Sequence, residues 1–353
     1  MSKNVFNGPP MKRPTALVPR ASVAATLTTQ LSIDDLNAAA REYILAASSP
    51  ATRRAYASDW RTFTRWCAGI GVSPMPADAA TLVRYLTHLA TSGKKVSTVE
   101  RARAAISVAH ETAHPLGADG KPAPNPSHSS EVKRVMKGIR NKNGAPRNKK
   151  TPVRTDALVQ MLEQANDGSL RGIRDAAMLA VGYAGAFRRS ELAAMKVEHL
   201  RIEQLDAANG GGEGLVILIP KSKTDQEGKG QWLGIQHQPT IDLLKAWLAR
   251  AKIESGHVFC RVRGDEVGEP LKPEAIAEVV KKYATALGLD PAKFAGHSLR
   301  RGFASQAIFD RKNPREIMKQ TRHKSIVVFE GYVEESSLFH NNASKDLWKV
   351  SEK

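Results

Sequence analysis

The feature that most constrains the fold is a basic segment without acidic residues near the middle of the chain, from Lys133 to Arg154. Gly144, Pro146 and Pro152 interrupt its second half. Such residues end helices, and a run of like charges cannot enter a hydrophobic core without a large desolvation cost. We therefore predict a basic linker over residues 142–154, which separates two domains.

The region before the linker has a helical pattern from Ile33 onward. Ser49-Pro50 and Asp78 are typical helix starts, and Ser97 with Glu100 has the spacing of a capping box. We predict a helical domain over residues 32–141. Residues 1–31 carry basic but no acidic side chains among Pro, Ser, Thr and Ala, which predicts a disordered basic tail.

The region after the linker mixes helices with two strands. Thr155-Asp156 is a predicted helix start, and apolar patterns predict further helices over residues 173–186, 239–251 and 273–287. The apolar runs 215–219 and 231–235 predict antiparallel strands joined by a hairpin. The fold class is therefore mainly α, with a second domain over residues 155–353 that contains a small antiparallel β-sheet.

Charge identifies the class of partner. The 353 residues are 41% hydrophobic, as in globular proteins, and carry a net charge of +18. This excess favours a polyanion, and nucleic acid is the natural candidate. Cys67 and Cys260 lack the spacing of a disulfide framework or a zinc site, and no apolar run is long enough to cross a membrane. We expect a soluble, reduced, cytoplasmic protein of bacterial, phage or plasmid origin, associated with the nucleoid.

Residues suited to phosphate chemistry gather late in the chain. His297 and Arg300 are predicted on the first turn of a helix, where a spacing of three places them on one face and free N–H groups attract anions. His323 and Tyr332 follow after a helix start at Asn313-Pro314. A lone His-x-x-Arg pair is usually only a solvated helix face, so the case depends on cations from elsewhere.

Two upstream motifs supply such cations. Arg188 ends a very apolar helix pattern, and Glu191, three residues on, can hold it in place. The predicted hairpin carries Lys221 and Lys223, although surface hairpins often carry lysine simply to remain soluble.

The order of these motifs resembles the tyrosine recombinase (phage integrase) family. Phe187–Leu192 resembles its first arginine box, Lys221–Thr224 its β-hairpin lysine, and Gly296–Arg300 its His-x-x-Arg box. Tyr332, nine residues after His323, resembles its nucleophile segment. The resemblance covers about residues 33–349, includes residues 258–263, and is greatest to Cre-like members. It implies a core-binding (SAM-like) first domain that clamps duplex DNA together with a catalytic second domain.

The resemblance also implies a set of roles. Tyr332 attacks a phosphodiester to give a 3′-phosphotyrosine and a free 5′-hydroxyl. Lys223 protonates the leaving 5′ oxygen, and His297 assists proton transfer from the phenol. Strands are then rejoined through a Holliday junction without ATP, because the phosphotyrosine keeps the bond energy.

The remaining residues of the implied site act on charge. Arg188 and Arg300 neutralise the non-bridging oxygens, so that two guanidinium groups replace a metal and no cofactor is expected. His323 donates to a phosphate oxygen, and Glu191 orients the arginine. Lys221 is an alternative to Lys223, and Arg189 and Arg301 could be confused with the catalytic arginines beside them.

Candidate DNA-binding residues lie in both domains. By alignment with Cre-like members, Ser97 takes a lysine's place, Arg101 a glutamine's and Glu274 an arginine's, so the target sequence should differ. The full set is Arg53, Arg54, Lys94, Lys95, Ser97, Thr98, Arg101, Lys149, Lys150, Arg261, Arg263 and Glu274.

Assembly is predicted from the end of the chain. Phe339, Ala343, Leu347 and Val350 form an apolar stripe at helical spacing. The stripe can pack on its own domain or, as the resemblance implies, on a neighbouring protomer. We expect a monomer when free, a dimer on one inverted repeat and a homotetramer when two sites pair.

Three other functions fit parts of the pattern. A type IB topoisomerase uses the same residues but relaxes supercoils as a monomer. A telomere resolvase is a further candidate, although such chains are usually longer. A basic DNA-binding regulator with an inert core belongs to a different class, and formation of a covalent protein–DNA adduct would exclude it.

Overall fold

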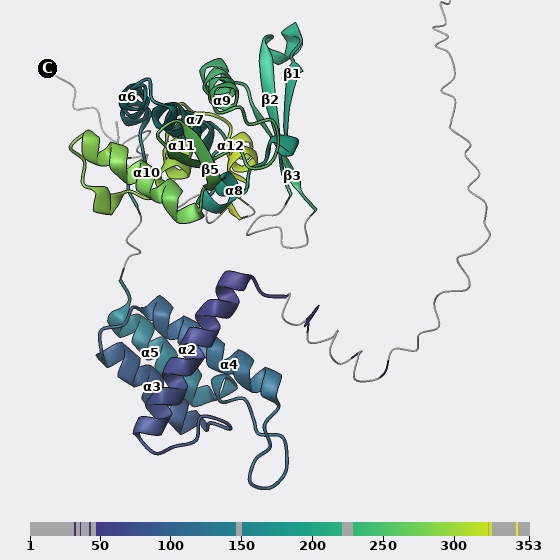
Figure 1. Cartoon of the computed structure of the whole chain (residues 1–353). Coiled ribbons are helices and arrows are strands. Elements are labelled where there is room, and N and C mark those ends of the chain that lie inside the picture. Colours follow the sequence, from purple (N-terminus) through teal and green to yellow (C-terminus); the bar gives the residue numbers. More distant parts are fainter. Residues whose placement is uncertain are drawn as a thin grey trace, which may run out of the picture. The chain divides into compact units, whose positions relative to one another are not determined.

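The computed structural model describes residues 47–145, 150–220 and 229–323, together with the isolated residues 32, 36, 42, 43, 325, 326 and 344. The chain divides into two compact units, an N-terminal unit (Met1–Ala145) and a C-terminal unit (Pro146–Lys353). Both are rich in helices, and the small sheets belong to the C-terminal unit (Figure 1). The predicted fold class, mainly α with a small antiparallel sheet, is confirmed.

The described part of the N-terminal unit contains four helices. Ser49, Asp78 and Ser129 cap three of them by accepting a backbone N–H, as expected for such residues. The helices are α2 (Pro50–Gly69), α3 (Ala79–Thr91), α4 (Val96–Ala113) and α5 (Ser130–Asn143), with a 3-10 turn at Pro126–His128.

One apolar core holds these helices together. Phe63 of α2, Leu86 of α3 and Ile106 of α4 are fully buried, and α5 adds Met136. Trp60 and Trp66 pack on its edge in a cluster of rings with Phe63 and Tyr85. The arginines of α2 lie on its exposed side, so the helix presents charge to solvent and apolar surface to the core.

The predicted capping box at Ser97 is wrong. Helix α4 begins at Val96, with Lys95 at the N-cap and no side-chain cap bond. Val96 packs against the apolar core, which favours an earlier start. Glu100 is engaged elsewhere, because it accepts a hydrogen bond of 2.7 Å from Arg140 of α5.

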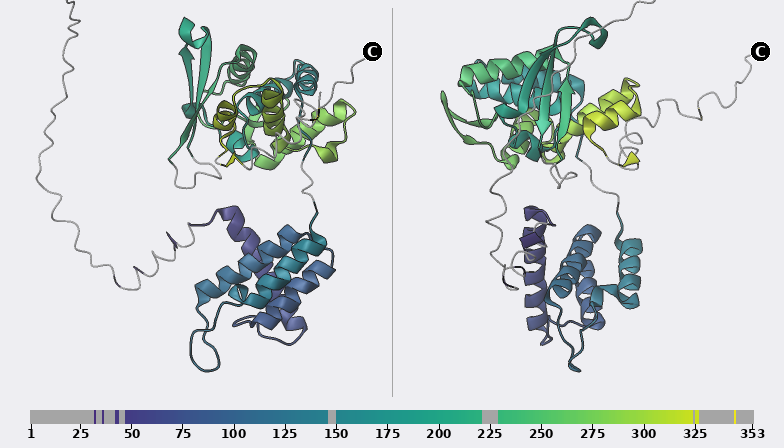
Figure 2. Two further views of the ribbon diagram at one scale, coloured as in Figure 1. Left: turned by 180° about the vertical axis from the view of Figure 1, so that it is seen from behind. Right: turned by 90° about the vertical axis from the view of Figure 1, so that its right-hand side faces the viewer.

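The C-terminal unit surrounds a long buried helix, α7, which packs most extensively on α9. Its three-stranded sheet lies beside α9 (Figure 2). The elements are α6 (Thr155–Ala165), α7 (Leu170–Ala184), α8 (Arg189–Ala193), β1 (Leu200–Gln204), β2 (Glu213–Ile219), β3 (Gln231–Ile235), α9 (Gln238–Ala251), β4 (Cys260–Arg263), β5 (Glu266–Pro270), α10 (Pro273–Ala286), α11 (His297–Phe309) and α12 (Pro314–Thr321).

The predicted strand pair is confirmed and belongs to a larger sheet. Strand β2 pairs antiparallel with β3, and Ile217 lies opposite Leu233. Alternate residues of both strands are buried in the main core, as a sheet covered on one face requires. Strand β1 and the separate β4–β5 hairpin were not predicted from the sequence.

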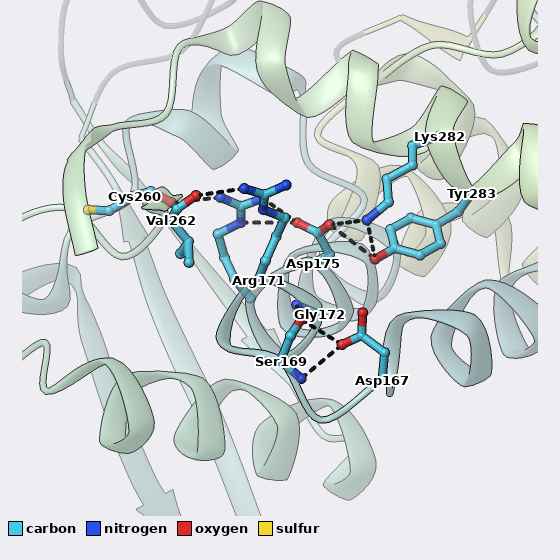
Figure 3. A network of polar contacts seen from close by, with 10 residues as sticks. Asp167, Ser169, Arg171, Gly172, Asp175, Cys260, Val262, Lys282 and Tyr283 are labelled. Carbon is cyan, nitrogen blue, oxygen red and sulfur yellow. Dashed lines mark hydrogen bonds and ion pairs between the residues drawn. The ribbon is translucent and has the colours of Figure 1, made fainter. Parts of the chain in front are cut away.

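An ionic network around the buried Asp175 ties α10 to α7. Asp175 accepts hydrogen bonds from Arg174 beside it and from Tyr283 of α10, at 2.6 and 3.0 Å. Lys282 completes the set at 3.3 Å, and its ammonium group also lies over the Tyr283 ring (Figure 3). Arg174 further donates to the Cys260 carbonyl of β4. Because every charge has a partner, the network fixes α10, which leads into α11.

The end of the predicted linker packs on the C-terminal unit. The N–H groups of Thr151 and Val153 donate to the carbonyls of Lys293 and Ser298, at 2.8 and 3.0 Å. Val153 is fully buried, and a Cβ at Gly302 of α11 would collide with its carbonyl. Residues 150–153 are therefore part of this unit, and Lys142 lies within α5.

The helix start predicted at Thr155-Asp156 also differs in detail. Thr155 is the first residue of α6, and Arg154 occupies the cap position without a side-chain bond. The Thr155 hydroxyl instead hydrogen-bonds with the phenol of Tyr183 at 2.9 Å.

Among the residues that the structure describes, no helix is long and apolar enough to cross a membrane.

Candidate active site

The candidate site is built around the turn between α7 and α8. The turn comprises Gly185, Ala186 and Phe187, and Ala186 adopts a left-handed backbone with φ of 46°. A Cβ at Gly185 would collide with the Phe187 ring, so only glycine fits there. The tight turn leaves carbonyl oxygens directed inward, where they accept hydrogen bonds from other helices.

Arg188 follows this turn and is held by Glu191, as the sequence predicted. Its Nη1 donates to Glu191 Oε1 at 2.6 Å, and its backbone N–H donates to Glu191 Oε2 at 3.0 Å. Burial opposes ionisation of Glu191, but Arg322 and Arg188 outweigh it, so the pKa of this carboxyl lies below its usual value. Arg189 is exposed, so its environment differs clearly from that of Arg188.

Helix α11 supplies His297 and Arg300. It begins at His297, as predicted, so both residues lie on its first turn. Arg300 is only 1% exposed, and its Nη1 donates to the Ala186 carbonyl at 2.8 Å. Arg301 is also buried, whereas the His297 residue remains exposed at the surface of the unit.

The segment after α12 supplies His323. Its Nδ1 lies 2.8 Å from the hydroxyl of Thr321, a fully buried residue. That hydroxyl lies 2.7 Å from the Ile317 carbonyl, to which it donates. The hydroxyl therefore accepts from His323 Nδ1–H, which fixes the tautomer of the neutral ring.

Both imidazoles lie within a cationic environment. Burial and then Arg300 and Arg188 lower the pKa of His297 to about 4, with a smaller effect of Arg301. Burial, Arg300 and Arg188 likewise lower the pKa of His323 to about 4. The four side chains come from three parts of the chain that meet at one turn, because Arg300 and Arg322, the residue before His323, both donate to carbonyls of the turn that precedes Arg188.

Several predicted site residues lie outside the described residues. They are Tyr332, Lys223, its alternative Lys221, and Lys149. The apolar stripe over residues 339–350 lies outside them too.

Most other candidate DNA-binding residues lie at the surface. In the C-terminal unit Lys150, Arg261, Arg263 and Glu274 are exposed. In the N-terminal unit Arg53, Arg54, Lys94, Lys95 and Ser97 are exposed, and Thr98 is half-buried.

Arg101 is exposed but already engaged. Its Nε and Nη2 donate to the two carboxylate oxygens of Asp59, at 2.7 and 3.1 Å. The pair holds the guanidinium of α4 against α2 in one orientation.

Sequence reasoning missed Arg322. Its guanidinium is buried, forms an ion pair of 2.9 Å with Glu191, and lies over the Phe187 ring. Neither periodicity nor a motif indicated it, because a basic residue at the end of a polar helix usually faces solvent.

Comparison with known proteins identifies the class. The model of the phage integrase family matches residues 152–337, more than half of the chain. The chain belongs to this family, the tyrosine recombinases, which are enzymes that break and rejoin DNA strands. The resemblance found in the sequence is thereby confirmed at the level of the family.

Individual relatives of this chain are recombinases as well. An integrase/recombinase xerD homolog of Selenomonas ruminantium is 36% identical over 305 residues, covering 84% of this chain and 85% of the relative. Tyrosine recombinase XerC of Chromohalobacter salexigens is 25% identical, with coverages of 81% and 86%.

Solved structures show the same fold. XerH recombinase bound to a palindromic difH substrate has a TM-score of 0.57 at 18% identity, over 78% of this chain and 73% of that one. A lambda integrase dimer bound to a COC′ core site has a TM-score of 0.55 at 17% identity, with coverages of 90% and 98%.

Proposed function

We propose that this enzyme is a site-specific DNA recombinase that uses Tyr332 as its nucleophile. The phenol oxygen attacks the scissile phosphorus, the P–O5′ bond breaks, and a 3′-phosphotyrosine and a 5′-hydroxyl result. Rejoining reverses these steps with a hydroxyl from the partner strand. The phosphotyrosine conserves the bond energy, so ATP is not part of the proposal, and guanidinium groups take the place of a metal cofactor.

Arg188 and Arg300 are the proposed electrostatic catalysts. The scissile phosphate gains charge on its non-bridging oxygens in the transition state, and preorganised guanidinium groups stabilise that charge. The rigid hold on both residues supports this role, since Glu191 fixes Arg188 and the Ala186 carbonyl fixes Arg300. Fixed donors need no reorganisation during the reaction.

Proton transfer falls to His297 and Lys223. With its pKa lowered to about 4, His297 is neutral near pH 7 and can accept the phenol proton of Tyr332. Lys223 is the proposed acid that protonates the leaving 5′ oxygen. The observation that carries the proposal is this combination of a neutral imidazole on α11 with two guanidinium groups that protein oxygens hold in place.

His323 is the proposed hydrogen-bond donor to a phosphate oxygen. Its Nδ1–H is used by Thr321, so Nε2 can donate only when the ring is protonated. The phosphate itself favours that state, because a nearby anion raises the pKa of an imidazole.

Duplex DNA is the proposed substrate, with half-sites arranged as inverted repeats. The net charge of +18 and the exposed cations Arg53, Arg54 and Lys95 support this partner. The N-terminal unit would act as core-binding domain, residues 144–149 as the basic linker, and the chain from residue 150 onward as catalytic domain. Such an enzyme would work in the bacterial cytoplasm, at the nucleoid.

Exchange would follow the Cre-like scheme, through a Holliday junction in a homotetramer. The apolar stripe from Phe339 to Val350 would dock on a neighbouring protomer, and the free protein would be a monomer. Truncation after Glu335 should then preserve cleavage at one site but abolish recombination between paired sites. Recombination at the full rate would instead show that the stripe serves only its own protomer.

The central experiment uses a nicked suicide duplex, which traps the covalent intermediate. The wild-type protein should form a protein–DNA adduct, and Tyr332→Phe should form none while binding DNA nearly as well. An adduct in the Tyr332→Phe variant would refute the nucleophile assignment. Recombinant products from paired sites would separate a recombinase from a topoisomerase, which only relaxes supercoils.

A further inference from the structure

We propose that Arg322 is a positioning residue that keeps Arg188 and His323 in register for strand cleavage. The inference rests on the proposed function, because it assigns Arg322 a part in the same site. Arg322 does not touch the phosphate in this scheme. It acts through Glu191 and through the turn that precedes Arg188.

The contacts of Arg322 converge on that turn. Its Nη1 donates to the Gly185 carbonyl and its Nη2 to the Ala186 carbonyl, at 2.9 and 2.8 Å. Nη2 also donates to Glu191 Oε2 at 2.9 Å. The guanidinium lies 5.1 Å from the centre of the Phe187 ring. Arg322 therefore contacts residues that precede Arg188 in the chain and one that follows it.

Gln320, two residues before Arg322, also contacts the end of α7. Gln320 donates from Nε2 to the Ala184 carbonyl at 2.9 Å and to the Gly234 carbonyl of β3 at 3.1 Å. Arg322 also donates to the Gln320 carbonyl. Because His323 follows directly, its position is coupled to the turn of Arg188 across more than a hundred residues of chain.

Charge sharing gives Arg322 a second effect. Glu191 accepts from the Arg188 guanidinium with Oε1 and from the Arg322 guanidinium with Oε2, so two guanidinium groups share one carboxylate. The cluster therefore retains a net positive charge that can face a phosphate. Without Arg322, the Glu191 carboxylate would neutralise Arg188 alone, and the site would attract the developing negative charge less strongly.

The backbone at Arg322 favours glycine, so the contacts of its side chain offset a conformational cost. Arg322 ends α12 with φ of 56°, a left-handed conformation in which a residue with a Cβ is less stable than glycine. Arg311, which follows α11, has the same φ of 56° but is exposed. The two arginines share residue type and backbone strain and differ in burial, so Arg311 is a matched control.

The test compares Arg322→Gly, Arg322→Lys and Arg311→Gly in the full-length protein. Single-turnover cleavage of the nicked suicide duplex, DNA affinity and thermal unfolding are measured for each. We expect Arg322→Gly to cleave about 10-fold or more slowly, below the ~10²–10³ typical of a direct donor, with nearly unchanged affinity. Arg311→Gly should cleave like the wild type. Wild-type rates in Arg322→Gly would overturn the proposal.

A double-mutant comparison distinguishes positioning from simple support of the fold. If Arg322 acts through Arg188, Arg322→Gly should slow an Arg188→Ala protein much less than it slows the wild type. Equal slowing in both backgrounds would show a structural role only. If Arg322→Gly does not fold, Arg322→Lys decides, because it keeps the charge but not the planar fork of donors. A folded Arg322→Lys should be slowed, and a wild-type rate would refute the proposal.

The outcome is independent of the proposed nucleophile. Absence of a wild-type adduct would refute the proposed function itself. A normal wild-type adduct together with full activity of the Arg322 variants would refute only the role of Arg322.

Discussion

The N-terminal unit and the candidate site use arginine in opposite ways. In the described part of the N-terminal unit, the ion pairs Arg101–Asp59 and Arg140–Glu100 join helices, and their arginine side chains are 49% and 51% exposed. In the candidate site Arg322 has a side chain only 4% exposed, and Arg300 is equally inaccessible. The same residue type therefore meets water in these ion pairs and protein in the candidate site.

This difference determines what each charge can do. Exposed charges interact through a high dielectric and are screened by salt, so they contribute through their sum. Buried charges are screened little and cannot move, so each one contributes through its position. Recognition of a long polyanion suits the first arrangement, and stabilisation of one reacting phosphate suits the second.

The largest expected effect is on Arg300. Arg300→Ala should slow adduct formation by on the order of 10²–10³, because a fixed donor to the transition state is lost. Arg189→Ala removes the same charge from an exposed position and serves as the control. Single-turnover cleavage measures both, and equal losses would mean that burial does not distinguish these arginines.

A smaller effect is expected at Arg101, the engaged cation of α4. If it reads a base edge, Arg101→Ala should reduce discrimination at one position of the target by about 1–3 kcal/mol. Asp59→Asn should relax specificity with little loss of affinity, because it frees the guanidinium without removing it. Binding to a library of single-base variants measures this, and uniform weakening across all sequences would assign Arg101 to the DNA backbone.

The histidines make the stability of the candidate site depend on pH. In the folded protein the pKa values of His297 and His323 are about 4, below the usual value near 6.5 in an unfolded chain. The unfolded state therefore binds more protons between these limits, and stability should fall as the pH drops from about 6.5 to about 4. Thermal unfolding across this range measures it. A His297→Asn, His323→Asn protein should show a flatter profile, and an unchanged profile would exclude these residues as the cause.

The smallest effect is expected at Arg140. Arg140→Ala breaks its 2.7 Å pair with Glu100, but both side chains are largely exposed. Such pairs contribute little, so the free energy of unfolding should fall by no more than about 1 kcal/mol. Denaturant titration measures this free energy, and a loss of several kcal/mol would contradict the contrast between exposed ion pairs and buried site arginines.

Local chemistry made much of this molecule predictable from its sequence. Asp78 and Asn313 mark helix starts because their side chains bind nearby backbone N–H groups. Arg188 and Glu191 meet because a spacing of three residues brings side chains together. The pairing of β2 with β3 follows from two apolar runs that lie close together in the sequence.

Contacts between distant residues were not predictable in the same way. Strand β1 is identified by its partner β2 rather than by its own sequence, in which exposed residues dominate. The sequence alone predicts Arg322 to be a surface cation, because only the fold places the end of α12 beside the α7–α8 turn. The capping box at Ser97 failed because Glu100 had a distant partner in Arg140.

The attachment of residues 150–153 has a practical consequence for work with isolated fragments. A catalytic fragment that starts at Thr155 would match the sequence-based boundary, yet it would remove Val153 from a buried position and leave the Ser298 carbonyl without its partner. Ser298 lies between His297 and Arg300, so the damage would fall on the first turn of α11. A fragment intended to retain activity must therefore begin before Lys150, and insertions or fusion points belong on the N-terminal side of that residue.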